Sequence, residues 1–571
     1  MPETSAEIYL SDMSRCEPAS LLSRERRRGH WRLIDYETPE TKGTMVFAVP
    51  GEGTPAITLP VDVRGCYRVY VGINYSRFDS GDHLHNLPWP LYGQVQLRFD
   101  DEPGYSRFAY EGGWDGELVE AKVARSIKVY TSIQETLWRV RDFDGPTRLH
   151  LSPMTEPYSD IAGSRLANLS YLRLVPVTGD ELAAWRRLRP RPETRNLAML
   201  WCAGMISGHA MGSPMYHPTN RQWFRDEIAP FVGTDIGTFV FEAIRGNLAM
   251  FPTQVGDTGA PDGGWDPSWV NPLAAFRDLA REHGMRIFAA MRMMGPGYPM
   301  IDVPIARGRF YWEHPQWAKC DRDGAATNNV SLAFPGVRAH WAALAREALD
   351  HGIDGLVLYL HRCQPFVLFE QPVVDDFRRL YGEDARQVPM EDERLRRLWA
   401  GYVTQFLREL RALVDERPGR QLGVCFYGAP YKFDTDDAYD PLRYNCDVDA
   451  WLREGLVDIL MPTPSASPAA IARWRTLGGA RVRIWPDLMP RMQPGADCAR
   501  RAREFYAAGA DGLCFWDGER RPPHVSEWSV MSRLGHRDDL DFLEREAPGF
   551  YRFYPLTKLW NFSVRFSFKD G

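Results

Sequence analysis

The sequence predicts a (β/α)8 TIM barrel preceded by an antiparallel β-sandwich, and three observations predict the barrel. From residue 196 onward, eight short apolar segments alternate with amphipathic helices, which is the element order of such a barrel. Many of the helices end in a glycine just before the next apolar segment, as at His351-Gly352. Three segments also resemble one another: IDGLVLYL from Ile353, ADGLCFWD from Ala510 and LVDILMP from Leu456. Such echoes are typical of a fold that repeats one unit.

The N-terminal third has a different texture. Residues 1–28 are rich in Pro, Ser and Arg and predict a flexible lead-in. Residues 29–178 contain short runs of β-branched and aromatic residues, such as Tyr67–Ile73, separated by Gly, Pro, Asp and Asn. This pattern predicts an antiparallel sandwich. Residues 179–195 are charged, carry two prolines and predict a linker.

The barrel is expected to span residues 196–537. Each predicted strand is a short apolar segment without alternation, as expected for strands covered on both faces. The eight segments are Asn196–Ala203, Thr238–Ala243, Arg286–Met291, Gly355–Leu360, Leu422–Tyr427, Val457–Met461, Val482–Trp485 and Gly512–Trp516. The tail, residues 538–571, is aromatic, and Val564, Phe566 and Phe568 alternate with polar residues. We expect it to pack back on the sandwich or the barrel.

Composition excludes several classes of protein. The chain has 571 residues, too many for one ordinary core. A net charge of −6 argues against a nucleic-acid partner. The N-terminus lacks a basic region followed by an apolar core, and no apolar run is long enough to span a membrane. The nine cysteines form no CxxC pair. We therefore expect a cytoplasmic protein without a membrane partner, and a homo-oligomer stays open.

Polar residues at the C-terminal ends of the predicted strands are the candidates for chemistry, because barrel active sites lie there. Cleavage of a glycosidic bond needs two carboxylates, with aromatic rings and arginines to hold the sugar. In this model Asp487 is the nucleophile or general base, and Glu242 or Glu370 is the general acid with a raised pKa. The remaining predicted site residues are Asp517, His361, Arg362, Arg292, Tyr359, Tyr427, Trp516, His217 and Arg245.

Other interpretations of the same residues stay open. A carboxylate beside an arginine at a strand end is often a structural ion pair. The spacing of His209 and His217 does not match the HxH of metal-dependent amidohydrolase barrels, and the run Asp434–Asp440 lacks the features of a calcium loop. No metal or cofactor is therefore expected. Asp354, Asp458 and Asp511 precede or open their strands, so we expect them to support stability at the opposite face.

Several stretches resemble a known family. IDGLVLYLHR from Ile353, DDFRRLYG from Asp375 and VDAWLREGLVDILMPTP from Val448 are similar to the glycosyl-hydrolase-like group related to family-10 barrels. GCYRVYVGIN from Gly65 resembles a strand of jelly-roll modules that accompany carbohydrate-active enzymes. The resemblance implies a jelly-roll-like sandwich and a glycosidase barrel. This chain departs from the group in having Tyr359 and Leu360 where the fourth strand usually ends in an acid.

The predicted function is a glycoside hydrolase acting on an oligosaccharide or glycoside. Two alternatives remain. One is a barrel that binds carbohydrate without cleaving it, which the missing strand-four acid favours. The other is a cofactor-free lyase or isomerase on sugar acids, in which Arg292, Arg362 and Arg491 would hold a carboxylate.

Overall fold

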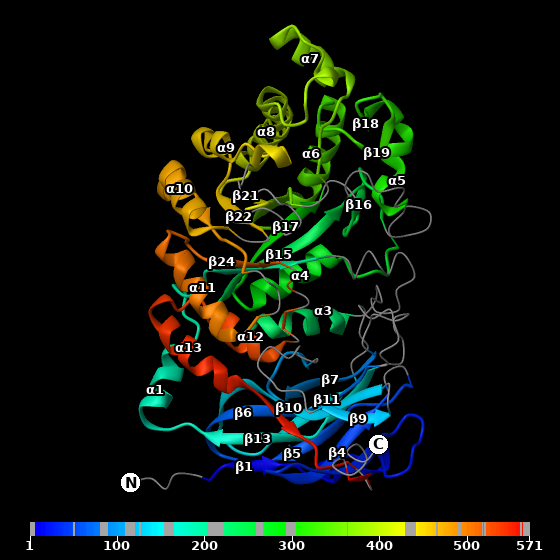
Figure 1. Cartoon of the computed structure of the whole chain (residues 1–571), viewed down its shortest axis with the longest axis vertical. Coiled ribbons are helices and arrows are strands. Elements are labelled where there is room, and N and C mark those ends of the chain that lie inside the picture. The colour runs from blue at the N-terminus through cyan, green and yellow to red at the C-terminus, as the bar shows by residue number, and fades with distance from the viewer. Residues whose placement is uncertain are drawn as a thin grey trace.

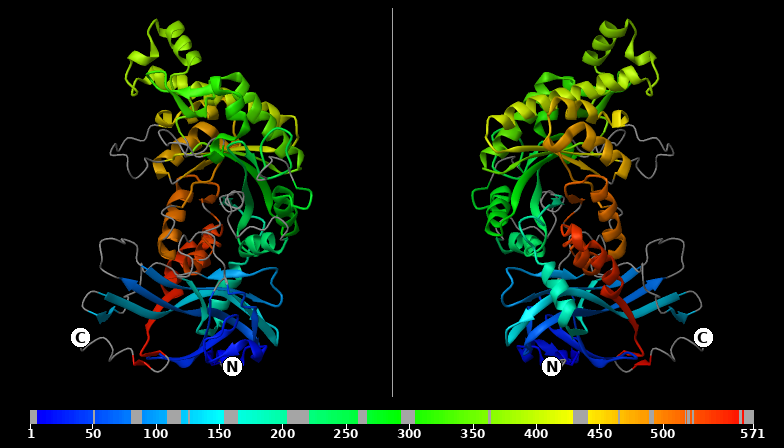
Figure 2. Two further views of the ribbon diagram at one scale, coloured as in Figure 1. Left: turned by 90° about the vertical axis from the view of Figure 1, so that its right-hand side faces the viewer. Right: turned by 90° about the vertical axis from the view of Figure 1, so that its left-hand side faces the viewer.

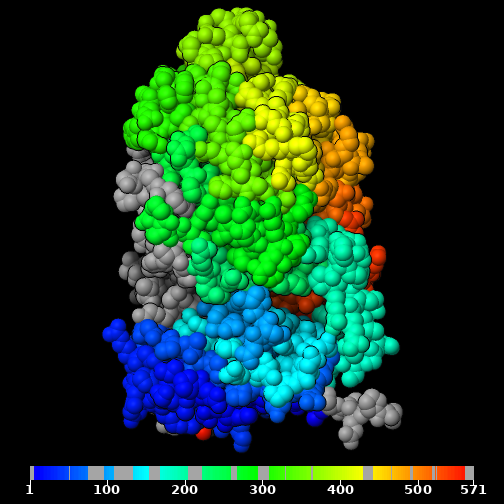
Figure 3. All heavy atoms as spheres, turned by 180° about the vertical axis from the view of Figure 1, so that it is seen from behind, coloured from blue at the N-terminus to red at the C-terminus, as the bar shows by residue number. Residues whose placement is uncertain are grey.

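The computed structural model contains an N-terminal β domain at one end and a barrel above it (Figure 1). The two pack directly against each other in the space-filling view (Figure 3). The structure describes residues 6–49, 52–79, 89–108, 120–124, 127–153, 165–202, 221–258, 266–292, 304–361, 364–428, 441–463, 466–488, 493–516, 518, 521–522, 524–559 and 562–563.

The predicted eight-stranded parallel barrel is confirmed. Its strands pair in parallel in the order β23-β22-β21-β20-β17-β15-β14-β24. A parallel bridge between Asp487 and Cys514 closes the remaining seam, between β23 and β24. All eight strands lie within two residues of their predicted bounds: β14 (Leu197–Trp201), β15 (Ile236–Arg245), β17 (Arg286–Arg292), β20 (Gly355–Tyr359), β21 (Gln421–Phe426), β22 (Ile459–Pro462), β23 (Arg483–Ile484) and β24 (Leu513–Trp516).

The barrel interior is filled by side chains, so the barrel is a packed core and not a pore. Leu200, Val240, Phe288, Val357 and Ile459 are fully buried in one cluster inside the ring. A second and larger cluster lies between the strands and the surrounding helices. These helices are α3 (Arg221–Ile228), α4 (Pro272–Glu282), α6 (Pro335–Asp350), α8 (Glu393–Asp415), α9 (Val448–Glu454), α10 (Pro468–Gly478), α11 (Gly495–Ala507) and α12 (Val525–Met531).

Additional elements extend from the barrel at the end away from the β domain. They are α5 (Pro304–Glu313), the hairpin β18 (Ala318–Cys320) and β19 (Ala326–Val330), and α7 (Gln371–Tyr381). Both side views show α7 projecting beyond the ring (Figure 2). Within the described residues, no helix is long and apolar enough to cross a membrane.

Three aspartates stabilise the bottom of the barrel in the same way. The Asp354 carboxylate accepts the backbone N–H of Ile287 at 2.9 Å, and its own N–H donates to the Ile287 carbonyl at 2.7 Å. Asp458 makes the same reciprocal pair with Leu422, and Asp511 makes it with Ile484. Each aspartate therefore joins the start of its own strand to the preceding strand, as the repeated sequences predicted.

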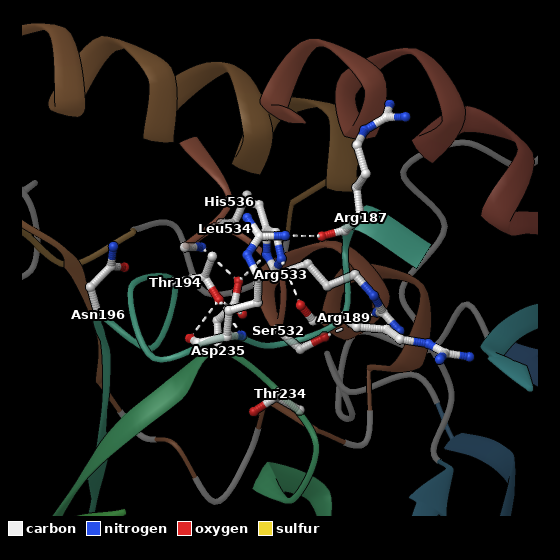
Figure 4. Close-up of polar contacts among 12 residues, drawn as sticks. Arg187, Arg189, Thr194, Asn196, Thr234, Asp235, Ser532, Arg533, Leu534 and His536 are labelled. Carbon is white, nitrogen blue, oxygen red and sulfur yellow. Dashed lines mark hydrogen bonds and ion pairs between the residues drawn. The ribbon is translucent and has the colours of Figure 1, made fainter. Parts of the chain in front are cut away.

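A buried ion pair joins the last part of the barrel to its first strands (Figure 4). Asp235 precedes β15, and its carboxylate lies 2.7 Å from His536 Nδ1. The same carboxylate accepts hydrogen bonds from the Thr194 hydroxyl and the Gly535 N–H. His536 Nε2 lies 3.1 Å from the Arg189 carbonyl. Since both ring nitrogens face acceptors, both must carry protons, and the imidazole is charged.

The N-terminal β domain is one continuous, mainly antiparallel set of strands, in the order β1-β13-β6-β7-β12-β4-β3 along its main path. The antiparallel prediction is confirmed, while the jelly-roll topology stays a prediction. The main strands are β1 (Ile8–Leu10), β3 (Trp31–Glu37), β4 (Lys42–Ala48), β5 (Ile57–Val61), β6 (Gly65–Asp79), β7 (Trp89–Phe99), β8 (Ser106–Phe108), β10 (Ile127–Phe143), β11 (Thr147–Ser152), β12 (Arg165–Leu169) and β13 (Tyr171–Pro176).

Two connecting segments differ from the expected loose chain. Within residues 1–28, β1 pairs with β13, and Met13 and Cys16 are buried in the domain core. The prediction of a flexible lead-in was therefore wrong for this part, because a few buried apolar residues are enough to anchor the segment to the β domain. The expected linker begins with helix α1 (Gly179–Arg187), whose Trp185 packs against Phe550.

The C-terminal segment crosses back to the β domain. After helix α13 (Leu540–Glu546), β25 (Tyr551–Pro555) pairs with β10, and β26 (Lys558–Leu559) pairs with β3. The alternating residues Val564, Phe566 and Phe568 lie outside the described residues. The chain therefore connects the two domains twice, once before the barrel in the sequence and once after it.

Candidate active site

Glu242 lies near the C-terminal end of β15, where two arginines hold its fully buried carboxylate. Arg245 donates from Nε to Glu242 Oε1 at 2.7 Å and from Nη2 to Oε2 at 3.3 Å. Arg292, the last residue of β17, donates from Nη2 to Oε2 at 3.1 Å. The ladder between β15 and β17 is irregular between Glu242 and Ile244. Carboxylate and guanidinium groups from neighbouring strands therefore meet at one point.

Cys202 completes this group from the strand on the other side. It directly follows β14, and its sulfur lies 2.9 Å from Arg245 Nη2 and 3.6 Å from Arg292 Nη2. The thiol also hydrogen-bonds Glu242. We call Cys202, Glu242, Arg245 and Arg292 the Glu242 cluster. It joins the ends of three adjacent barrel strands.

The electrostatics of the cluster keep Glu242 ionised. Burial raises the pKa of a carboxyl group, but here the charges of Arg245 and Arg292 and the hydrogen bonds from Arg245 and Cys202 outweigh it. They lower the pKa of Glu242 to about 2. The expectation of a raised pKa, as a general acid needs, was therefore wrong for Glu242. A carboxylate with this pKa can act as a nucleophile, as a base or as a fixed negative charge.

An aromatic wall lies beside the cluster. The Tyr359 ring, at the end of β20, meets the Trp516 ring edge-on with centroids 4.9 Å apart. The His361 ring lies 3.9 Å from Trp516 and 5.4 Å from Tyr359. Tyr427, after β21, extends the wall at 6.5 Å from His361. Arg292 Cζ lies 5.5 Å from the Trp516 ring, which connects the wall to the Glu242 cluster.

The Tyr359 hydroxyl is buried and finds no hydrogen-bond partner within the described part of the chain. Burial, with further contributions from Cys425, Glu242 and Cys202, raises the pKa of this phenol well above its usual value, although Arg292 opposes the change. The hydroxyl is therefore protonated and able to donate. Because an unpaired buried polar group is costly, a ligand or a water that accepted this hydrogen bond would be favoured.

Asp487 follows β23 and is fully buried. Its contacts are to the backbone of β24 and to Arg521, and they do not extend to the Glu242 cluster within the described residues. Its Oδ1 accepts the Trp516 N–H at 3.0 Å and a hydrogen bond from Arg521 Nη2 at 3.2 Å. Arg521 also donates from Nε to the Trp516 carbonyl at 2.9 Å, and its Nη1 lies 3.5 Å from Glu527 Oε1. Asp487 and Arg521 together fix the backbone of Trp516. This is the structural ion pair weighed above, and a catalytic role for Asp487 stays a prediction.

Glu370 lies apart from these residues, at the position before the first residue of α7. Burial raises the pKa of its carboxyl group to about 7, against hydrogen bonds from the Leu368 and Cys320 N–H groups. The expected raised pKa is therefore confirmed. However, these contacts tie Glu370 to the hairpin and the α7 region, and none of its described contacts is to the Glu242 cluster. Its role as a general acid stays a prediction.

Three predicted site residues, His217, Arg362 and Asp517, lie outside the described residues. Of the predicted set, the structure brings together Glu242, Arg245, Arg292, Tyr359, His361, Tyr427 and Trp516, with Asp487 behind Trp516. In the described ranges, no group of three or more His, Cys, Asp or Glu side chains could hold a metal ion.

Two residues of the site were missed in the sequence. Cys202 directly follows β14 but lies inside the predicted strand Asn196–Ala203, so the choice of residues at the strand ends passed over it. Arg521 lies five residues after the end of β24, and no sequence pattern around it predicts its contacts. Only the three-dimensional structure shows that it pairs with Asp487.

The chain was compared with protein families, curated proteins and solved structures. A scan against protein-family models found no match, and a search of curated proteins found none. Among solved structures, the catalytic domain of β-amylase from Paenibacillus polymyxa aligns with 62% of this chain and 99% of its own, at 10% identity and a TM-score of 0.42. An α-galactosidase from Thermus thermophilus aligns over 88% and 94%, at 12% identity and a TM-score of 0.33.

A third structure, an archaeal fructose 1,6-bisphosphate aldolase, aligns over 62% of this chain and 98% of its own, at 11% identity and a TM-score of 0.29. All three TM-scores are below 0.5. The assignment of the barrel therefore rests on the strand order and register described above, and the neighbours carry no argument about activity.

Proposed function

We propose that this protein is a glycoside hydrolase whose active site lies at the C-terminal mouth of the barrel, around the Glu242 cluster. The observation that carries the proposal is an ionised, buried carboxylate beside an aromatic wall. Glycosidic cleavage passes through a transition state with positive charge on the sugar, which a fixed carboxylate stabilises. Aromatic rings offer flat apolar faces for the sugar ring.

Within this proposal Glu242 is the nucleophile or the general base, because its low pKa keeps it deprotonated at any physiological pH. The proton donor is Asp517, the predicted carboxylate that directly follows β24, because Asp487 is held as an ion pair by Arg521. Tyr359 donates a hydrogen bond to a sugar oxygen, and Trp516, His361 and Tyr427 surround the ring. Substituting Asp517 and Asp487 one at a time with Asn tests this assignment.

A second candidate is a lyase or isomerase that acts on sugar acids without a cofactor. The observation that favours it is the presence of two guanidinium groups, Arg245 and Arg292, at the same strand ends. Guanidinium groups bind carboxylates through paired hydrogen bonds. In this candidate the substrate carboxylate contacts these arginines, and Glu242 abstracts a proton.

One experiment separates the candidates. The purified protein is incubated with neutral glycosides, uronate-containing glycosides and oligosaccharides, and the products are separated by chromatography. Release of a reducing sugar from a neutral glycoside supports the hydrolase. Conversion of uronates alone, with unsaturated or isomerised products, supports the second candidate. Saturable binding of sugars without any product contradicts both and identifies a carbohydrate-binding barrel.

A further inference from the structure

A cavity of about 210 Å³ lies where the N-terminal β domain meets the barrel. One wall comes from β8 and β10 of the β domain and carries Arg107, Trp138 and Arg139. The opposite wall comes from α12 and the residues after it, including Trp528 and Arg533. The segment that connects α3 to β15 forms the third side. A cavity of this size is well above that of a single water.

Of the three arginines on the two walls of the cavity, two form ion pairs with carboxylates. Arg107 pairs with Glu227, and Arg139 pairs with Glu102. Within the described residues, no carboxylate forms an ion pair with Arg533. Its Nη1 instead donates to the Ser529 carbonyl at 2.6 Å and to Ser532 Oγ at 3.2 Å. Among the described residues that line the cavity, two arginines are paired with carboxylates and the third, Arg533, is not.

The neighbouring carboxylate, Asp235, does not supply the missing negative charge. It already accepts hydrogen bonds from His536, Thr194 and Gly535, as the close-up shows for the first two (Figure 4). His536 is charged, since its two ring nitrogens face Asp235 and the Arg189 carbonyl. The Asp235–His536 pair is thus neutral as a unit.

The surroundings of Arg533 disfavour its charged form. Burial, together with the charge of Arg139, lowers the pKa of Arg533 to about 10, although Asp235 opposes the change. Arg533 is half-buried, and its hydrogen bonds go to neutral oxygens, so no carboxylate of the described residues pairs with its charge. A counter-ion of opposite charge relieves the cost of such a cation. Arg139 comes from the facing wall, so an anion between the two arginines would contact both domains.

We propose that this cavity is a binding site for a small anion, a carboxylate or a phosphate, held between the guanidinium groups of Arg533 and Arg139. Guanidinium groups bind both anions through paired, charge-assisted hydrogen bonds. The Trp138 and Trp528 side chains also line the cavity. Since the walls belong to different domains, the bound anion stabilises the junction between the β domain and the barrel.

The test measures binding of inorganic phosphate and of acetate to the full-length protein by equilibrium dialysis, with potassium chloride keeping the ionic strength constant. Arg533→Gln removes the unpaired charge. Arg186→Gln is the matched control, because Arg186 is an exposed arginine on α1 that does not line the cavity. Arg533→Lys keeps the charge but loses the fork of two nitrogens.

We expect one saturable site per chain in the wild type and in Arg186→Gln. Arg533→Gln should bind about tenfold more weakly or worse, and Arg533→Lys should lie between them. Saturation by phosphate alone or by acetate alone identifies the class of ligand, and either result supports the site. Circular dichroism shows whether Arg533→Gln is folded. If it is not, weaker anion binding by Arg533→Lys than by the wild type is the result that tests the site.

Two results overturn the proposal. One is equal binding to the wild type and the folded Arg533 variants, and the other is an absence of saturable binding of either anion to the wild type. The assay contains no sugar. Its failure therefore leaves the proposed hydrolase untouched, and a missing hydrolase activity leaves the anion site untouched.

Discussion

Arg292 Nη2 donates a hydrogen bond to Glu242 Oε2 at 3.1 Å, and this bond joins the ends of the neighbouring strands β17 and β15. Together with Arg245, it turns a buried carboxylate that would favour protonation into one that stays ionised. The arrangement fixes a negative charge at the barrel mouth, beside the rings of Tyr359 and Trp516. The proposed chemistry depends on that charge.

Replacing Arg292 with Met should raise the pKa of Glu242, because one of the two cations that lower it is lost. The acid limb of the pH–rate profile should move to higher pH. Stability should fall by about 3 kcal/mol, as expected when one partner of a buried ion pair is removed. Urea unfolding and kcat/KM between pH 3 and about 8 measure both effects.

The control for this substitution is Arg286→Met, at the other end of β17. Arg286 covers the Phe288 ring and lies far from the strand's C-terminal end. This variant should leave the pH–rate profile unchanged. An acid limb that stays in place in Arg292→Met would contradict the assigned cause of the low pKa.

Tyr359→Phe should leave stability nearly unchanged, within about 0.5 kcal/mol, because the hydroxyl it removes has no partner in the described residues. It should lower kcat/KM about tenfold or more, because a hydrogen bond to the substrate is lost. Tyr171→Phe is the matched control, since that buried hydroxyl donates to Glu135 at 3.0 Å. The control should lose stability and keep activity, and the reverse pattern would exclude Tyr359 from the site.

Asp354→Ala should destabilise the barrel by about 1–3 kcal/mol, because the Ile287 N–H of the preceding strand loses the carboxylate oxygen that accepts it at 2.9 Å. Turnover per folded molecule should not change, since the residue lies at the face opposite the site. Asp350→Ala, which removes a carboxylate from an exposed ion pair with Arg417, should cost almost nothing. Equal losses in the two variants would show that the repeated aspartates carry no special structural role.

Glu370 predicts a dependence of stability on pH. Its folded pKa of about 7 lies above the ordinary 4.5, so the folded state holds a proton that the unfolded chain releases. Below pH 4.5 both states are protonated and there is no effect. Stability should therefore fall as pH rises from 4.5 to 7, by roughly 3 kcal/mol in total.

Glu370→Gln, which resembles the protonated form, should remove this slope. Denaturant unfolding of the wild type and the variant at several pH values measures it. If both proteins lose stability equally over the range, a different group causes the change.

The sequence predicted the positions of the barrel strands well, because buried parallel strands are short, continuous apolar runs bounded by glycine. It also predicted that Asp354, Asp458 and Asp511 stabilise the bottom, since strand polarity alone places them there. It could not predict the protonation of Glu242, because that depends on how closely two guanidinium groups approach the carboxylate, those of Arg245 and of Arg292, which is 50 residues away. For the same reason it could not distinguish Asp487 as a partner of Arg521, which lies 34 residues further along the chain.

The most direct test of the central claim compares two buried carboxylates that are both paired with arginine. Glu242→Gln removes the charge at the barrel mouth, while Glu227→Gln removes a carboxylate on α3 that contacts Arg107 and Trp201 and has no described contact with the Glu242 cluster. With the best glycoside found, kcat/KM should fall about 1,000-fold or more in Glu242→Gln and no more than about threefold in Glu227→Gln. Equal activity in the two folded variants would contradict an active site at Glu242.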